Sequence, residues 1–289
     1  VGESAKAYAD AQSVYAEPKP PPAALCKASI VRANAAPKAA KGGPADPWAD
    51  AITACAGEPE LVNALYNGAK AASSQKKRDD ALARFALVEQ KFPRHRLADD
   101  ARFRAAMIVK DGGDEDKALK MLEALPADYP DGDMKGEALF RVATAAMQAG
   151  KSDEARAALS RVDDGAPDDR QWATAGRAAY FLAKLDEQAG DKAKARAGYE
   201  AIVRSRPLFF YMAMAYARLA EMDPDGAKKL LDGAIAAERS QAPEGRLPDA
   251  LQNVHFTRAV ELLRAQEIEP ARRELAATGA LDANADPLG

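Results

Sequence analysis

Two stretches of this chain read almost alike: QAGKSDEARAAL at 148–159 and QAGDKAKARAGY at 188–199. In each, an alanine stands five residues after the glycine and begins the sequence Ala-Arg-Ala. Aligning the whole chain on that alanine gives four units, with spacings of 37, 37 and 40 residues. The aligned alanines are Ala81, Ala118, Ala155 and Ala195. The chain therefore contains an internal repeat.

Large apolar side chains follow each alanine at fixed distances. Four residues later stand Phe85, Leu122, Leu159 and Tyr199. Seven residues later stand Val88, Leu125, Val162 and Ile202. Steps of four and seven residues fall on one face of an α-helix. Each unit is therefore expected to contain an amphipathic helix with one buried face.

The boundaries of the units also recur. Twelve residues after each alanine comes a proline, which stops one helix or opens the next; these are Pro93, Pro130, Pro167 and Pro207. Five residues before three of the alanines comes a glycine, which suits the left-handed backbone of a helix end. The glycines are Gly113, Gly150 and Gly190, and the first unit has Lys76 instead. Each unit is predicted to be helix, turn, helix.

The segment ahead of the turn repeats as well, because ADDARFRAA at 98–106 matches KGEALFRVA at 135–143, with Phe103 and Phe140 coinciding. Together these features resemble the tetratricopeptide repeat over roughly residues 75–220. Alanine, 69 of the 289 residues, favours helices and their close approach. The expected fold is an all-α, tetratricopeptide-like helical-hairpin solenoid, an α-superhelix whose concave surface is available to a partner.

Three regions are expected. Residues 1–74 should form a helical N-terminal cap with a helix near 2–16 and Pro-rich linkers at 17–23 and 35–47. Residues 75–222 should form four hairpins. Residues 223–289 should continue the superhelix with further hairpins. After Pro207, helices are predicted at about 208–222, 225–239, 248–265 and 269–278.

Charge and hydropathy exclude several classes of partner. Lys plus Arg number 41 against 44 Asp plus Glu, a net charge of -3 with the two signs interleaved. That balance argues against nucleic acid or anionic lipid as the main partner. The apolar stretches are shorter than the roughly 20 residues that a membrane span needs. The first residues do not show the pattern of a cleavable signal peptide.

The two cysteines, Cys26 and Cys55, flank a segment rich in Pro, Gly and Ala. A disulfide closing that loop is the preferred interpretation, and it favours an oxidising compartment such as the periplasm. Two buried free thiols in a cytosolic protein are the alternative.

Residues with catalytic or ligand chemistry are sparse. The two histidines, His95 and His255, have no cysteine or acidic cluster at metal-ligand spacing and no visible catalytic partner. No glycine-rich loop has the form needed to hold a phosphate. The acidic pairs at 163–164 and 168–169 flank Pro167, where solvated turn residues are the better interpretation of them. No catalytic residue, cofactor site or metal site is predicted.

Two surfaces remain as candidate ligand-binding sites. Basic residues adjoin two repeat-boundary prolines and could meet an anionic ligand along one edge, although acidic residues at the intervening turn favour solvated charges. These basic residues are Arg94, His95, Arg96, Arg204 and Arg206. The aromatic run at 207–219 could line a sugar-binding surface, but Phe209, Met212 and Tyr216 share one face, which favours a buried helix.

That aromatic run, extended as RPLFFYMAMAYARLAEMDP at 206–224, resembles the helical part of soluble lytic transglycosylases. The segment HFTRAVELLRAQEIEPARRELAATG at 255–279 is similar to the next hairpin of that family. Arg258, Ala259, Glu261 and Leu262 match its first helix, and Ala271, Arg272, Glu274 and Leu275 match its second. The resemblance implies a bacterial, periplasmic protein that faces peptidoglycan.

In that family a glutamate in a separate lysozyme-like domain cleaves the glycan. This chain has no Glu-Ser followed by an apolar or aromatic residue and proline, since Glu3-Ser4 is only a dipeptide, and it has no Gly-Leu-Met-Gln-like helix. No residue here therefore inherits the catalytic role, and enzymatic activity of the parent protein is left open. The chain is interpreted as the non-catalytic superhelical domain, which positions glycan strands or partner proteins. The alternative is a stand-alone periplasmic repeat scaffold for proteins or peptides, similar to the helical modules of the outer-membrane assembly lipoprotein or the Tol-Pal coordinator.

Overall fold

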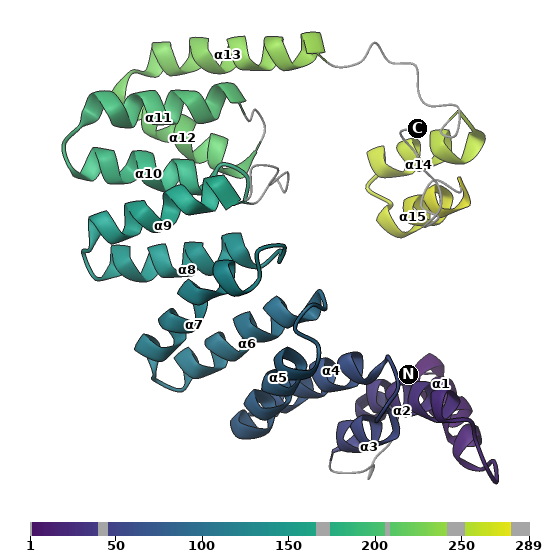
Figure 1. The fold of residues 1–289 in the computed structure, drawn as a ribbon. Coiled ribbons are helices and arrows are strands. Elements are labelled where there is room, and N and C mark those ends of the chain that lie inside the picture. Colours follow the sequence, from purple (N-terminus) through teal and green to yellow (C-terminus); the bar gives the residue numbers. More distant parts are fainter. Residues whose placement is uncertain (1, 40–45, 166–173, 206–208, 242–251, 279–289) are drawn as a thin grey trace. The chain divides into compact units, whose positions relative to one another are not determined.

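The computed structural model describes residues 2–39, 46–165, 174–205, 209–241 and 252–278, and within these ranges every regular element is an α-helix (Figure 1). The first eight helices are α1 (Gly2–Tyr15), α2 (Pro22–Ala39), α3 (Pro47–Ala54), α4 (Leu61–Ser74), α5 (Arg78–Lys91), α6 (Leu97–Asp111), α7 (Glu115–Asp128) and α8 (Lys135–Gln148). The others are α9 (Ser152–Gly165), α10 (Arg177–Gln188), α11 (Lys192–Ser205), α12 (Phe210–Met222), α13 (Pro224–Gln241), α14 (Val254–Arg264) and α15 (Ile268–Ala277). The chain divides into two compact units, Val1–Ala227 and Lys228–Gly289.

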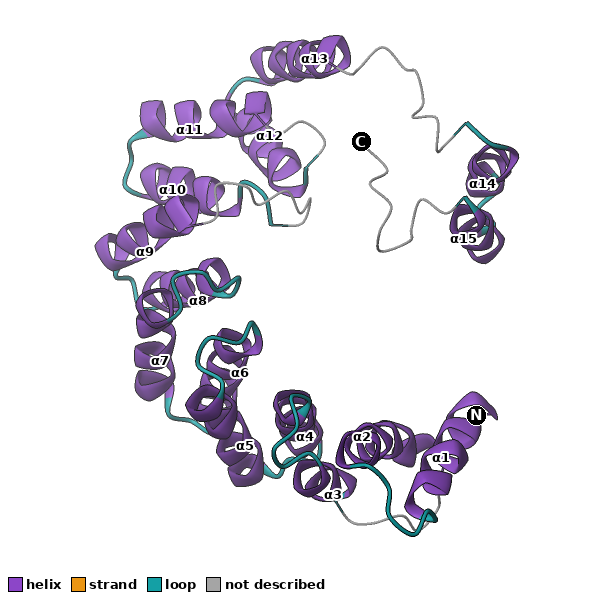
Figure 2. Ribbon diagram, turned by 45° about the vertical axis from the view of Figure 1, so that its right-hand side comes forward, coloured by secondary structure: helices purple, strands orange, loops and turns teal. Residues whose placement is uncertain are grey.

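Consecutive helices pair as hairpins, and each hairpin packs on the next. In the first unit α4 packs on α5, α6 on α7, α8 on α9 and α10 on α11, while the second helix of each pair contacts the first helix of the following one. Figure 2 shows the first helices α6, α8, α10 and α12 along one side of this unit and the second helices α5, α7, α9 and α11 along the other. The predicted fold class, an all-α tetratricopeptide-like solenoid of helical hairpins, is confirmed.

One residue in the left-handed conformation closes each of five hairpins. These residues are Lys76 (φ 60°), Gly113 (φ 91°), Gly150 (φ 73°), Gly190 (φ 85°) and Gln266 (φ 60°). The next N–H reaches back to the carbonyl five residues earlier, as from Lys77 to Ala72 at 2.9 Å and from Glu267 to Leu262 at 2.8 Å. This Schellman arrangement satisfies carbonyls that the helix end would otherwise leave unpaired. Lys76 takes the place of glycine in the first turn, as the sequence register predicts.

The alanine five residues after each left-handed residue is buried between the two helices. Ala81, Ala155 and Ala195 have no exposed surface, and Ala118 is 1% exposed. Ala271 is also fully buried and stands five residues after Gln266, so α14–α15 follows the same register. The apolar residues four positions later in the first four units, such as Phe85, fill the space beside these alanines. A small residue at this point lets the two helices approach closely.

The N-terminal region differs from the sequence expectation in two places. α2 runs from Pro22 to Ala39 and includes Pro37, where an extended linker at 35–47 was predicted. Alanines dominate this end of α2, as in ANAAPKA, and their helix propensity extends the helix past residue 35. In addition, α4 begins at Leu61 and pairs with α5, so residue 75 lies inside the turn of the first hairpin. Residues 40–45 lie outside the described part.

A disulfide joins α2 to the end of α3. Cys26 and Cys55 are bonded, with a Cα–Cα distance of 4.5 Å, and neither has exposed surface. They lie in a small core with Trp48 and Ala64. Residue Asp46 precedes α3, accepts hydrogen bonds from two N–H groups of its first turn and pairs with Arg84 of α5. The cap is therefore tied to the first hairpin.

The C-terminal helices lie close to the predicted ranges. α12, α13 and α15 fall within a few residues of 208–222, 225–239 and 269–278. The predicted helix at 248–265 corresponds to α14 at its C-terminal end, and residues 242–251 lie outside the described part. The boundary between compact units falls after Ala227, inside α13, whereas the sequence placed a boundary after residue 222.

Candidate binding surface

The first helices of five hairpins carry an aromatic residue at an equivalent position. Each stands ten residues before the left-handed turn residue: Tyr66, Phe103, Phe140, Tyr180 and Phe256. Tyr66 and Tyr180 are buried, whereas Phe103, Phe140 and Phe256 are half-buried. The sequence showed only the match of Phe103 with Phe140. Counting back ten residues from Lys76, Gly190 and Gln266 finds the other three.

Aromatic rings form a continuous series across α8, α10 and α12. Phe140 lies 5.4 Å from Phe181, and Phe181 lies 6.2 Å from Tyr211, measured between ring centroids. Phe210 packs edge-on against Tyr211 at 5.1 Å and is 45% exposed. Met214, one turn further along α12, is 40% exposed. The aromatic run near residue 210 is thus packed on one side and accessible on the other.

A groove of about 470 Å³ lies between α4 and α6. Its apolar lining comes from α6, with Phe103, Met107 and Ile108, and from Phe85 below. Lys70 of α4 and Arg104 of α6 line it as exposed cations, and Asp111 lies at the end of α6. The groove thus combines an apolar surface with an excess of positive charge, as ligand sites with a few placed polar groups do.

Tyr66 holds the two cations of this groove near one another. Arg104 donates from Nε to the Tyr66 hydroxyl at 2.7 Å, and that hydroxyl donates to Asp100 at 3.2 Å. The Lys70 ammonium lies 5.6 Å and the Arg104 guanidinium 5.7 Å from the centre of the Tyr66 ring. Burial raises the pKa of Tyr66, so the phenol stays neutral. Among the described residues, no carboxylate forms an ion pair with Lys70 or Arg104.

A second groove, about 560 Å³ in volume, lies between α10 and α12, where Lys184 and Arg218 are balanced by Glu187 and Glu221. Arg218 pairs with Glu187 and, at 2.5 Å, with Glu221. Glu187 also accepts a hydrogen bond from Tyr199 at 2.9 Å. The hydrogen bond from Arg218 holds the pKa of Glu187 below its usual range, against the effect of burial. These groups link α10, α11 and α12, so they serve packing between hairpins.

The basic residues predicted at one edge lie in two separate places among the described residues. Arg94 and Arg96 are exposed in the turn between α5 and α6, and the His95 ring accepts a hydrogen bond from the Leu97 N–H at 3.2 Å. Arg204 lies in the last turn of α11, with α6 to α10 between the two groups (Figure 1), and pairs with Glu200 at 2.9 Å. Arg206 lies outside the described residues. The proposed anionic-ligand edge stays a prediction.

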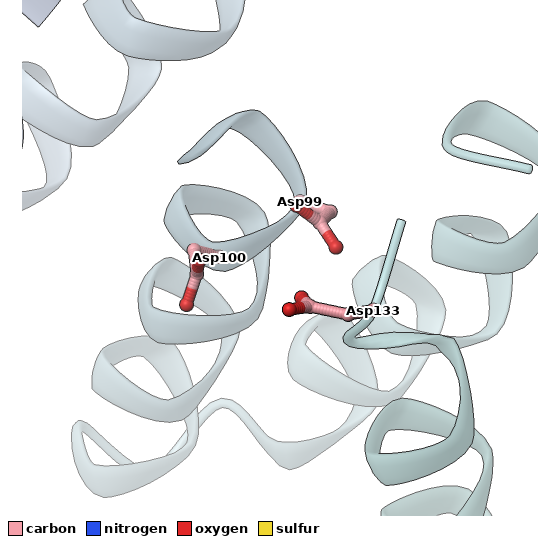
Figure 3. A group of neighbouring side chains, drawn as sticks. All are labelled: Asp99, Asp100 and Asp133. Atoms are coloured by element: carbon pink, nitrogen blue, oxygen red, sulfur yellow. The ribbon is translucent and has the colours of Figure 1, made fainter. Parts of the chain in front are cut away.

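A cluster of three carboxylates lies where α6 meets the turn before α8. Figure 3 shows Asp99 on α6 and Asp133 pointing toward one another, with Asp100 on the same helix beside them. One oxygen of each carboxylate lies within 4.8 Å of one oxygen of the other two. Asp99 is buried and accepts a hydrogen bond from the Met134 N–H at 3.0 Å. Burial and the charges of Asp99 and Asp100 raise the pKa of Asp133. Asp99 accepts from the Met134 N–H and Asp100 from the Tyr66 hydroxyl, so groups on neighbouring hairpins already bind these two carboxylates. The cluster therefore serves packing between hairpins.

The other candidate residues from the sequence include His255, two acidic pairs and one face of α12. His255 Nδ1 lies 2.7 Å from Glu274 and links α14 to α15, a pair that sequence spacing did not indicate. The side chains of 163–164 and all of residues 168–169 lie outside the described part. The expected helix face with Phe209, Met212 and Tyr216 is buried at Met212 and half-buried at the other two positions. None of the described helices is long and apolar enough to cross a membrane.

Taken together, the hairpin stack and the grooves between its first helices define a repeat protein of the kind that presents surfaces to other proteins. Two segments, 100–132 and 137–168, match the family model of the tetratricopeptide repeat. They cover most of α6–α7 and of α8–α9. The chain thus contains a tetratricopeptide-repeat-like helical domain, and such repeats imply a protein partner.

Comparison with solved structures finds a similar chain in a tetratricopeptide repeat protein from Parabacteroides merdae ATCC 43184. The two share 15% sequence identity with a TM-score of 0.44, over 96% of this chain and 94% of that one. No curated protein sequence matches this chain.

Proposed function

We propose that this chain is a scaffold that binds a protein or peptide along the first helices of its hairpins. The observation that carries the proposal is the accessible apolar surface on that side, above all the α4–α6 groove and the exposed Met214 of α12. The two matched tetratricopeptide repeats support it, because repeats of this class act through such surfaces. An extended segment or helix of a partner would lie across several hairpins.

We further propose a periplasmic location. The Cys26–Cys55 disulfide supports this, because disulfides persist in oxidising compartments and are rare in the cytosol. Expression with an export signal and without one, followed by mass measurement of the unreduced protein, tests this. A disulfide that forms equally in the reducing cytosol would remove its support for the location.

The binding proposal is tested by selecting a random peptide library against the purified chain. Met107→Glu in the α4–α6 groove and Met214→Glu on α12 should each weaken binding of some selected peptides, because a carboxylate then faces apolar side chains. Ser160→Glu, on the exposed side of second helix α9, is the matched control and should leave binding unchanged. Peptides whose binding is insensitive to both methionine changes would place the partner elsewhere.

A second candidate is the superhelical domain of a periplasmic lytic transglycosylase, which positions peptidoglycan for a glycan-cleaving domain. The exposed ring of Phe210 supports it, because sugar rings stack on accessible aromatic faces. The test is co-sedimentation with purified peptidoglycan sacculi, comparing the wild-type chain with Phe210→Ser. Retention that depends on Phe210 supports the glycan; no retention of the wild type rejects it and leaves the protein partner.

A further inference from the structure

The α4–α6 groove differs in its charge from two other grooves in the described part of the first unit. The α10–α12 groove has Arg218 neutralised by two glutamates. The groove between α7 and α8 is lined by more acidic than basic groups, among them the Glu115 and Glu154 carboxylates. In the α4–α6 groove the two cations exceed the single carboxylate of Asp111.

The cations of this groove have no direct ion-pair partner in the described part of the chain, and Asp100 meets Arg104 through the Tyr66 hydroxyl. Arg104 is held through its Nε by the Tyr66 hydroxyl, which leaves its terminal nitrogens available. Guanidinium groups bind carboxylates through two parallel hydrogen bonds, and a guanidinium that is already held loses less entropy on binding. Lys70 is exposed on the facing helix, so an incoming carboxylate can lie between helices α4 and α6.

Apolar side chains of α6 lie beside these charges. Met107 and Ile108 are half-buried and line the groove together with Phe103. Methionine adapts its shape to different apolar partners and contacts aromatic rings favourably. A partner that supplies only negative charge would leave this apolar surface in water, and a partner that supplies only apolar groups would leave the cations unpaired.

We propose that the α4–α6 groove binds an acidic peptide segment of a partner protein, with an apolar side chain against Phe103 and Met107 and a neighbouring carboxylate at Lys70 and Arg104. This inference rests on the proposed function and specifies the partner for one groove. Charge complementarity with Lys70 and Arg104 predicts that the peptide is acidic, and the apolar lining predicts an apolar residue beside its carboxylate.

The experiment measures binding of three synthetic peptides of equal length by fluorescence anisotropy. One alternates Asp with Leu, the second replaces Asp by Asn, and the third replaces Asp by Lys. The wild-type chain should bind the Asp peptide at least about tenfold more tightly than the Asn peptide at low salt. At about 0.5 M salt this ratio should shrink, because screening shortens the range of the charges.

Charge reversal at the groove supplies the decisive comparison. Lys70→Glu combined with Arg104→Glu should remove the preference for the Asp peptide and produce a preference for the Lys peptide. A gain of binding to the Lys peptide cannot come from unfolding, so the result is informative even if stability falls. Lys192→Glu, a single charge reversal at an exposed position on second helix α11, should leave the preference of the wild type intact.

The outcomes separate the two proposals. If peptides from the random library bind through Met214 but the Asp peptide is not preferred, the scaffold function stands and the acidic partner is rejected. If the Asp peptide binds with equal affinity to the wild type and the charge-reversed variant, the groove is not its site. If no peptide of any composition binds, the scaffold function fails and this inference fails with it.

Discussion

Asp99, in the first turn of α6, accepts a hydrogen bond at 3.0 Å from the backbone N–H of Met134, directly before α8. The bond joins two successive hairpins and satisfies a donor at the start of the second. Gly132 lies so close that a side chain there would meet the Asp99 carboxylate. The junction therefore depends on a buried acid and on the absence of a Cβ beside it.

Replacing Asp99 by Ala should lower the free energy of unfolding by about 1.5 to 3 kcal/mol, because the Met134 N–H loses a charged acceptor. Asp99→Asn keeps an acceptor oxygen and should cost less. Urea denaturation of both variants measures the difference. Equal losses in the two variants would show that charge at Asp99, and not its hydrogen bond, stabilises the junction.

Asp133→Asn should stabilise the chain at neutral pH. Burial and the charges of Asp99 and Asp100 raise the pKa of Asp133 above 3.8. The stability that the protonated Asp133 contributes is therefore fully present below pH 3.8 and is lost as pH rises through the raised pKa. Asparagine removes the repulsion, for a gain of about 0.5 kcal/mol because the exposed side chain is screened by water. Melting temperatures should converge as pH falls toward 3.8; a gap that persists there would contradict the electrostatic cause.

Substitutions at two left-handed turn residues, Gly150 and Lys76, should change the stability of the chain in different directions. Gly150→Ala places a Cβ at φ 73° and should cost about 1 to 2 kcal/mol. Lys76→Gly relieves the same conformation at φ 60°, a gain offset in part by the greater freedom of glycine in the unfolded chain. Thermal denaturation should therefore show Lys76→Gly to be neutral or stabilising. A loss comparable to that of Gly150→Ala would mean that the lysine side chain contributes contacts of its own.

Reduction of the disulfide should destabilise the N-terminal region. Cys26 and Cys55 are 29 residues apart, and in the chain-entropy model a loop of that size stabilises by roughly 3 kcal/mol. Hydrogen exchange with and without reductant should show faster exchange in α2 and α3, with α8 and α9 unaffected. A thiol reagent that modifies either cysteine in the native, unreduced protein would show that the bond is absent.

Placing Leu at position 155 should open the α8–α9 hairpin. Ala155 is fully buried in the core cluster that the two helices share with α10. Overpacking at such a site costs about 1 to 3 kcal/mol. Denaturation measures this loss, and Ala157→Leu, at an exposed position on the same helix, is the control.

The helical hairpins could be predicted from the sequence because short, fixed spacings between residues define them. The left-handed residue, the alanine five positions on and the apolar residue after it all lie within one turn and one helix, so alignment found them, including Lys76. α4 was not predicted as part of the first hairpin because the repeat was taken to begin at residue 75, at the turn that follows α4. Asp99 and Met134 escaped for a different reason: they lie on different hairpins, and no spacing within a repeat indicates that a buried acid meets the next helix start.

The five Schellman turns close on their own backbone, so the turn inside each helix pair forms its backbone hydrogen bonds within that pair. The groove residues Lys70, Arg104 and Met107 lie outside that framework. A duplication of one whole helix pair would consequently carry its scaffold intact while leaving a fresh set of exposed positions free to diverge. Such a chain can grow longer and acquire new specificities by separate genetic steps.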